Sequence, residues 1–158
     1  MNRHASLSLF VLSILSLATP AYADVLAGKI CEASCDRFRT ISIFGDTMNG
    51  NTEPLSLLGG PAQSGMLDAS AMVYDPGEKT VLVADFYGQS IHVFPAAARG
   101  DVAPLRSFSS AHMGQPRNIV RVSGQDEYIA LSASFLLAFP RTATGSQFPL
   151  RMTTYAPT

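Results

Sequence analysis

The sequence predicts an all-β fold built from repeated four-stranded antiparallel units, about three of them in the chain. The first observation is a frame, F-x5-G-x3-P-L, which occurs three times without an insertion: at Phe44–Leu55, Phe94–Leu105 and Phe139–Leu150. The second is the spacing of these copies, 50 and then 45 residues from Phe to Phe. The third is that the length differences fall in loops, where an insertion displaces no packed backbone. A repeat of this length is typical of a β-propeller or another stacked array.

The second unit shows the strand signals most clearly. Ala71–Tyr74 is apolar and runs into the turn residues Asp75–Glu78. The continuous apolar run Thr80–Ala84 comes next, and Ile91–Phe94 follows a turn that contains Gly88. Because the middle run has no polar alternation, we expect both of its faces to be buried, as in a sheet that lies between two neighbouring sheets.

The repeated frame follows the third strand of each unit and predicts a fourth, outer strand. Its Gly permits a turn with positive φ, and its Pro fits only an edge strand or the first residue of a strand. Two positions of the third strand recur and are expected where neighbouring units touch: Ile41, Ile91 and Leu136, and Phe44, Phe94 and Phe139. The predicted units span approximately 24–60, 61–110 and 111–158. Only a short strand, Asp24–Ala27, is expected in the innermost place of the first unit.

The run AMVYDPGEKTVLVADFYGQSIHVF resembles the NHL-type β-propeller blade. In that pattern an apolar strand, a Gly turn, an apolar strand ending in Ala-Asp and a tight turn precede Ile-x-Val-Phe. The extension FPAAARGDVAPLR is similar to the linking segment of secreted bacterial propellers, and the resemblance extends approximately from Ile30 to Tyr155. It implies a propeller of four-stranded blades. The third unit has Leu131-Ser132 in place of Ala84-Asp85, so a role of the Asp is not repeated.

The N-terminus predicts export. A short basic start precedes the apolar stretch Leu7–Leu17, and Ala21-Tyr22-Ala23 is an A-x-A cleavage signal. Residues 1–23 are therefore expected to be a signal peptide, with a mature chain that begins at Asp24 and resides in the periplasm or outside the cell. The apolar stretch is too short to span a bilayer, so no membrane span is expected.

The number of units predicts assembly. The mature domain, 24–158, has 158 − 23 = 135 residues and so about three units, whereas propellers close with roughly four to eight blades. Two chains could join into a ring, three blades could stand as an open arc, or the chain could be a shortened remnant. A homo-oligomer through the terminal blades is expected because a face lined by Ile41 and Ile43 would otherwise be uncovered.

Cys31 and Cys35 are the only two cysteines, and an exported protein meets an oxidising environment. Alignment with the second unit puts Cys31 at the place of Val81 and Cys35 at that of Asp85, on one strand, with Cα atoms about 13 Å apart against a limit of about 7 Å for a disulfide. A local disulfide therefore requires a tight loop, and an intermolecular disulfide or free thiols are the alternatives. The C-x3-C spacing fits neither haem attachment nor a redox pair, and a zinc site would need two more ligands.

Charge and composition exclude some classes of partner. The chain has 11 Lys and Arg against 12 Asp and Glu and no basic block, so nucleic acid is not expected to bind. The absence of Trp argues against small sugar-binding propellers, although Tyr74, Tyr87 and Phe86 offer other aromatic faces.

No catalytic or metal-binding set is predicted, and no cofactor is expected. His92 is expected on a partly exposed strand face, since its equivalents are Ser42 and Leu137, and no Ser-His-Asp set follows from spacing alone. The residues with which a ligand could be bound are Arg117 and Asn118, at the entrance of an innermost strand, and Asp85 and Tyr87, in the turn after a buried strand. A capping role at the strand entrance is the alternative for Asn118.

These observations favour an exported β-propeller module that binds or assembles without chemistry of its own. One alternative is a metal-dependent, lactonase-like hydrolase built on a propeller ring, which would need acidic ligands around its axis. Another is a degenerate fragment of a larger propeller.

Overall fold

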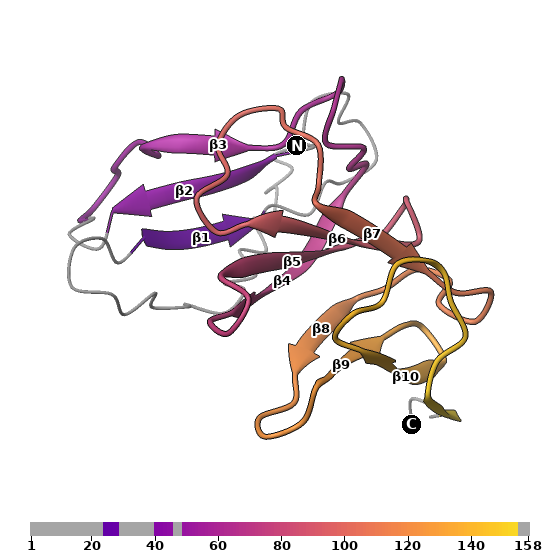
Figure 1. Cartoon of the computed structure of the whole chain (residues 1–158). Coiled ribbons are helices and arrows are strands. Elements are labelled where there is room, and N and C mark those ends of the chain that lie inside the picture. The colour runs from indigo at the N-terminus through magenta and orange to yellow at the C-terminus, as the bar shows by residue number, and fades with distance from the viewer. Residues whose placement is uncertain (1–23, 29–39, 46–48, 155–158) are drawn as a thin grey trace, which may run out of the picture.

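The computed structural model describes residues 24–28, 40–45 and 49–154 of the 158-residue chain, the first of these ranges by its backbone only. All regular elements in these ranges are strands, which form three sheets that follow one another in chain order (Figure 1). Neighbouring strands are antiparallel, apart from one short parallel pair. The all-β, antiparallel part of the predicted fold class is thus confirmed, and none of the three sheets closes on itself.

The first sheet has the order β1-β2-β3, with β1 at Asp24–Gly28, β2 at Ile41–Gly45 and β3 at Ser56–Leu58. β1 pairs directly with β2 and places Val25 opposite Phe44, just as Val81 lies opposite Phe94 in the second sheet. The prediction that β1 takes the innermost place is therefore wrong, because β1 takes the place of a second strand. The order of residues along the chain does not show which strand β1 pairs with, because strand pairing depends on hydrogen bonds between distant segments.

The second sheet has the order β11-β7-β6-β5-β4. Its strands are β4 (Ala69–Asp75), β5 (Thr80–Asp85), β6 (Ser90–Pro95), β7 (Arg106–Ser109) and β11 (Gly145–Ser146). All six residues of β5 are buried, which confirms the expectation drawn from its continuous apolar run. The strand lies between β4 and β6 in the sheet and has a further sheet against each face.

The third sheet has the order β12-β10-β9-β8. Its strands are β8 (Asn118–Arg121), β9 (Glu127–Leu131), β10 (Phe135–Pro140) and β12 (Arg151–Thr154). β12 is the outer strand that the repeated frame predicts, as β3 and β7 are in the other sheets.

Two apolar layers hold the sheets together. The layer between the first and second sheets contains Ile41, Ile43 and Phe94, and the layer between the second and third contains Leu82, Ile91 and Phe139. Phe94 and Phe139 are equivalent residues of the repeat and are both fully buried, as predicted. Each layer is therefore built by the Phe-bearing face of one sheet and the opposite face of the sheet before it.

The expectation that Ile41 and Ile43 line an uncovered face is wrong. Their side chains are 0% and 1% exposed and pack against the second sheet. Side chains alternate along a strand, so Phe44 points to the other face of β2, away from these two residues. Leu136 also departs from its equivalents, because it is 38% exposed.

The repeated Gly adopts positive φ in all three copies: 60° at Gly50, 72° at Gly100 and 64° at Gly145. Two of the copies tie neighbouring sheets together. Gly100 bridges to Leu58 in the outer strand of the first sheet, and Gly145 pairs in parallel with Phe108 in the outer strand of the second. The segment that follows each unit's third strand therefore binds the backbone of the preceding sheet.

A buried carboxylate also ties the second sheet to the third. Asp75, at the end of β4, accepts hydrogen bonds from Tyr128 Oη at 2.6 Å and from Arg141 Nε and Nη2 at 2.7 and 2.6 Å. Burial opposes the ionisation of Asp75, but the hydrogen bonds from Arg141, Tyr128 and the turn amides of Glu78 and Gly77 outweigh it and lower its pKa. The group is therefore a charged structural tie.

Candidate functional site

Asp85 lies at the end of β5 and organises the turn that follows. Its carboxylate is fully buried and accepts hydrogen bonds from four donors: the amides of Leu67 at 2.8 Å, Asp68 at 2.8 Å and Gly88 at 3.0 Å, and His92 Nε2 at 3.3 Å. Burial opposes ionisation, but His92 and the three amides outweigh it and hold the pKa of Asp85 below its ordinary value. Both carboxylate oxygens are thus engaged inside the protein.

His92 is buried, and the expectation of a partly exposed histidine is wrong. Its side chain is on β6, and the residue is only 7% exposed. Nδ1 lies 2.8 Å from Ser107 Oγ, and Nε2 lies 3.2 Å from Ser90 Oγ in addition to its contact with Asp85. The pairing of β6 with β7 brings Ser107 opposite His92 and so supplies a partner for Nδ1, and spacing along the chain does not show that pairing.

Steric and backbone constraints lock the turn between Asp85 and Ser90. A Cβ on Gly88 would lie 2.2 Å from Asp85 Oδ2, so only glycine fits there without a shift. Gln89 takes a positive φ of 51°, and the amide of Phe86 donates a 2.8 Å hydrogen bond to the carbonyl of Asp68. The backbone of the turn is therefore held in one conformation, and Phe86 and Tyr87 project from it.

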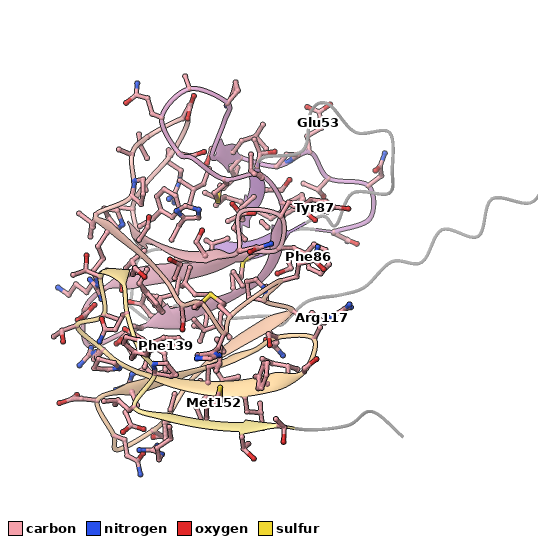
Figure 2. All side chains as sticks on the ribbon, turned by 90° about the vertical axis from the view of Figure 1, so that its right-hand side faces the viewer. Glu53, Phe86, Tyr87, Arg117, Phe139 and Met152 are labelled. Carbon is pink, nitrogen blue, oxygen red and sulfur yellow. The ribbon has the colours of Figure 1, made fainter. Side chains whose placement is uncertain are left out.

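Phe86 and Tyr87 of this turn, together with Arg117 from the segment before β8, form an aromatic and cationic surface. The rings of Phe86 and Tyr87 meet edge to face with centroids 5.1 Å apart, and Arg117 Cζ lies 5.4 Å from the centroid of the Phe86 ring. Figure 2 shows all three along one side of the molecule. Tyr87 is 56% exposed and Arg117 is also exposed, whereas Phe86 is partly buried beneath them. We call this cluster the Phe86–Tyr87–Arg117 surface.

The sequence-predicted site residues take different places around this surface. Tyr87 and Arg117 belong to it, and Phe86 joins them. Asp85 lies beneath it as the anchor of the turn. Asn118 is exposed next to Arg117, and its Oδ1 accepts a 2.8 Å hydrogen bond from the amide of Ile119.

Two further expectations concern cysteine and metal chemistry. Cys31 and Cys35 lie outside the described residues. Within 24–28, 40–45 and 49–154, no group of three or more His, Cys, Asp and Glu side chains is placed to hold a metal ion. The same part of the chain contains no helix that is long and apolar enough to cross a membrane.

Comparison with known proteins adds no assignment to this geometry. No protein-family model and no curated protein matches the chain.

Proposed function

We propose that the protein is an exported, non-catalytic binding module of the β-propeller type, and that it binds its ligand at the Phe86–Tyr87–Arg117 surface. The observation that carries the proposal is the exposure of Tyr87, on a turn locked by a buried carboxylate, beside the exposed Arg117, which precedes β8 and lies over the Phe86 ring of that turn. Such a surface loses little conformational entropy when a ligand binds, so more of the contact energy appears as affinity.

The residue types indicate the chemistry of the ligand. The Arg117 guanidinium presents several donors in a fixed plane and suits a carboxylate or phosphate group. The exposed ring of Tyr87 suits a flat or apolar group, and its hydroxyl can bond to a polar edge. A ligand with an anionic group beside a flat, apolar face would engage both residues.

The non-catalytic part of the proposal is supported by the way the acidic and basic groups are used. Asp85 and His92 are buried and bonded to each other and to the turn, and Asp75 is buried against Tyr128 and Arg141. A general acid or base must reach the proton that it transfers. These groups instead stabilise the turn and the contact between the second and third sheets.

Three features support the propeller and export parts of the proposal. The repeat frame recurs at a propeller-like period, the antiparallel sheets stack face to face through equivalent residues, and the blade segment around Asp85 resembles the NHL type. The A-x-A signal at Ala21–Ala23 supports export to the periplasm or the medium.

The proposal is tested by an NMR fragment screen of the isotope-labelled protein, with small anionic, aromatic and neutral compounds. Hits are expected to shift the signals of Tyr87, Phe86 and Arg117, with anionic aromatic compounds the strongest. The double variant Tyr87→Ala, Arg117→Ala should lose these hits. The matched control, Phe148→Ala with Arg99→Ala, removes an exposed aromatic ring and an arginine elsewhere and should retain them. Hits that gather at another surface, or that survive in the double variant, would contradict the proposal.

A metal measurement tests the non-catalytic part separately. The purified protein is expected to carry no stoichiometric metal, and a chelator is expected to leave its melting temperature unchanged. A full equivalent of a divalent metal, together with a fall in melting temperature on chelation, would favour the metal-dependent hydrolase instead.

A further inference from the structure

The outer face of the third sheet has the apolar composition of a buried layer. Strand pairing places Leu131 beside Leu136 on this face, and Ile129 beside Val120 and Ala138. Val120 is 46% exposed and Leu136 is 38% exposed, although each lies within a strand rather than in a loop. An ion pair between Arg151 of β12 and Glu127 of β9 lies at one end of the sheet.

The same face of the second sheet is covered. In the repeat, Leu82, Ile91 and Val93 correspond to Ile129, Leu136 and Ala138, and all three are 0% exposed because the third sheet packs on them. The outer face of the third sheet therefore repeats a surface whose partner in this molecule is another sheet of the same kind.

The complementary face lies at the other end of the molecule. On the first sheet, Phe44 and Leu57 point away from the second sheet, since they alternate with Ile43 and Leu58. Phe44 is equivalent to Phe94 and Phe139, which are fully buried between sheets, yet it is only partly buried, and Leu57 is 44% exposed.

The segments that contain the repeated Gly also indicate that each sheet contacts the sheet before it. Gly100 and Gly145 each bind the outer strand of the preceding sheet. Gly50 has the same backbone conformation, but among the described residues no sheet precedes its own and no bridge to Gly50 is formed. At the other end β12 is an edge strand whose four residues are all exposed.

We infer that a second copy of this chain packs the Phe44 and Leu57 face of its first sheet on the Leu136 and Val120 face of the third sheet, head to tail. The contact would extend the order of sheets already present, and the segment around Gly50 of one copy would lie along β12 of the other. Because this contact joins two different faces, two copies joined twice would close a ring of about six sheets. The inference does not depend on the ligand surface.

Sedimentation velocity of the full chain, expressed for export, tests the inference. Protein concentrations between about 5 and 200 µM cover dissociation constants in the micromolar range for the contact between two chains. The wild-type protein is expected to sediment as a two-chain species. Leu136→Asp and Leu57→Asp should each sediment as single chains, because each puts an unpaired charge in the apolar contact. Val120→Asp provides a second variant of the third sheet's face in case Leu136→Asp folds poorly, and circular dichroism verifies the fold of each.

Mixing the two variants tests the head-to-tail arrangement. Leu136→Asp leaves the first sheet's face intact and Leu57→Asp leaves the third sheet's face intact, so an equimolar mixture retains one sound contact. It should therefore form a two-chain species, weaker than the wild type because one contact holds it in place of two. Leu105→Asp is the control, since Leu105 is 62% exposed directly before β7 of the second sheet, which contributes to neither face, and it should assemble as the wild type does.

Three results would overturn the inference. The first is a wild-type protein that remains a single chain up to the highest concentration. The second is an assembly that Leu136→Asp abolishes and Leu57→Asp leaves intact, which would mean that two identical faces meet. The third is a mixture of the two variants in which every molecule stays a single chain.

Discussion

Removing the hydroxyl of Tyr128 should destabilise the contact between the second and third sheets. Tyr128 is fully buried, and its hydroxyl donates a 2.6 Å hydrogen bond to Asp75 Oδ2. Tyr128→Phe keeps the ring and its packing, so the change acts on the hydrogen bond alone. Asp75 then retains Arg141 and the turn amides as partners.

The magnitude follows from the charge on the acceptor. A hydrogen bond to a charged group contributes about 1.5 to 3 kcal/mol, against about 1 kcal/mol for a neutral pair. Because Asp75 is ionised and buried, the free energy of unfolding should fall by about 1.5 to 3 kcal/mol at neutral pH. That is a large part of the stability of a domain of this size, which is typically about 5 to 15 kcal/mol.

The effect should also depend on pH. The pKa of Asp75 is lowered in the folded protein, so its stabilising contribution is present above the unfolded pKa of about 4 and is lost as the pH falls through the folded value. Tyr128→Phe removes one of the donors that lower this pKa. The difference in stability between the two proteins should therefore shrink in acid.

Urea unfolding followed by circular dichroism measures this prediction at pH 7 and at pH values below about 4. Tyr87→Phe is the matched control, because its hydroxyl is on an exposed side chain and its loss should change the stability by less than about 0.5 kcal/mol. The reasoning is refuted if both variants unfold at the urea concentration of the wild type, or if the loss in Tyr128→Phe persists unchanged in acid.

Three other predictions concern the buried core, the turn between Asp85 and Ser90, and the expected signal peptide. Phe94→Ala should lower the free energy of unfolding by about 3 to 5 kcal/mol, as large-to-small changes in cores do. Phe148→Ala, at a ring that is 82% exposed, should lower it by less than about 0.5 kcal/mol. Equal urea midpoints for the two variants would contradict the position of Phe94 between sheets. Gly88→Ala should lower the melting temperature, because its Cβ would lie 2.2 Å from Asp85 Oδ2, and an unchanged melting curve would mean that the turn is not locked. Intact-mass measurement of exported material should show a chain that begins at Asp24, and retention of the first 23 residues would contradict the export prediction.

Much of the fold follows from local signals in the sequence. The continuous apolar run of β5, the turn residues on either side of it and the Gly with positive φ each place a strand or turn without reference to distant residues. The repeat then transfers these assignments from the second unit to the third. Phe139 could be assigned to a buried layer because Phe94 occupies the same frame.

The remaining features depend on pairing between distant segments. The second sheet packs on one particular face of β2, and the sequence does not show which face that is. The repeat could therefore align Ile41 with Ile91 without showing which residues cover Ile41. Both ring nitrogens of the buried His92 have partners because β7 brings Ser107 opposite it and Asp85 reaches Nε2. The Phe86–Tyr87–Arg117 surface joins residues from two sheets, and composition alone could not show that Arg117 lies over the Phe86 ring.

We propose that the buried Asp85 holds the turn that carries Phe86 and Tyr87, and that Arg117 packs on the Phe86 ring, before any ligand binds. Nuclear Overhauser measurements on the free protein test it most directly. The account predicts cross-peaks from the Arg117 side chain to the Phe86 ring and between the rings of Phe86 and Tyr87, and it predicts that Asp85→Asn weakens them. Averaged signals without these cross-peaks in the wild-type protein would contradict it.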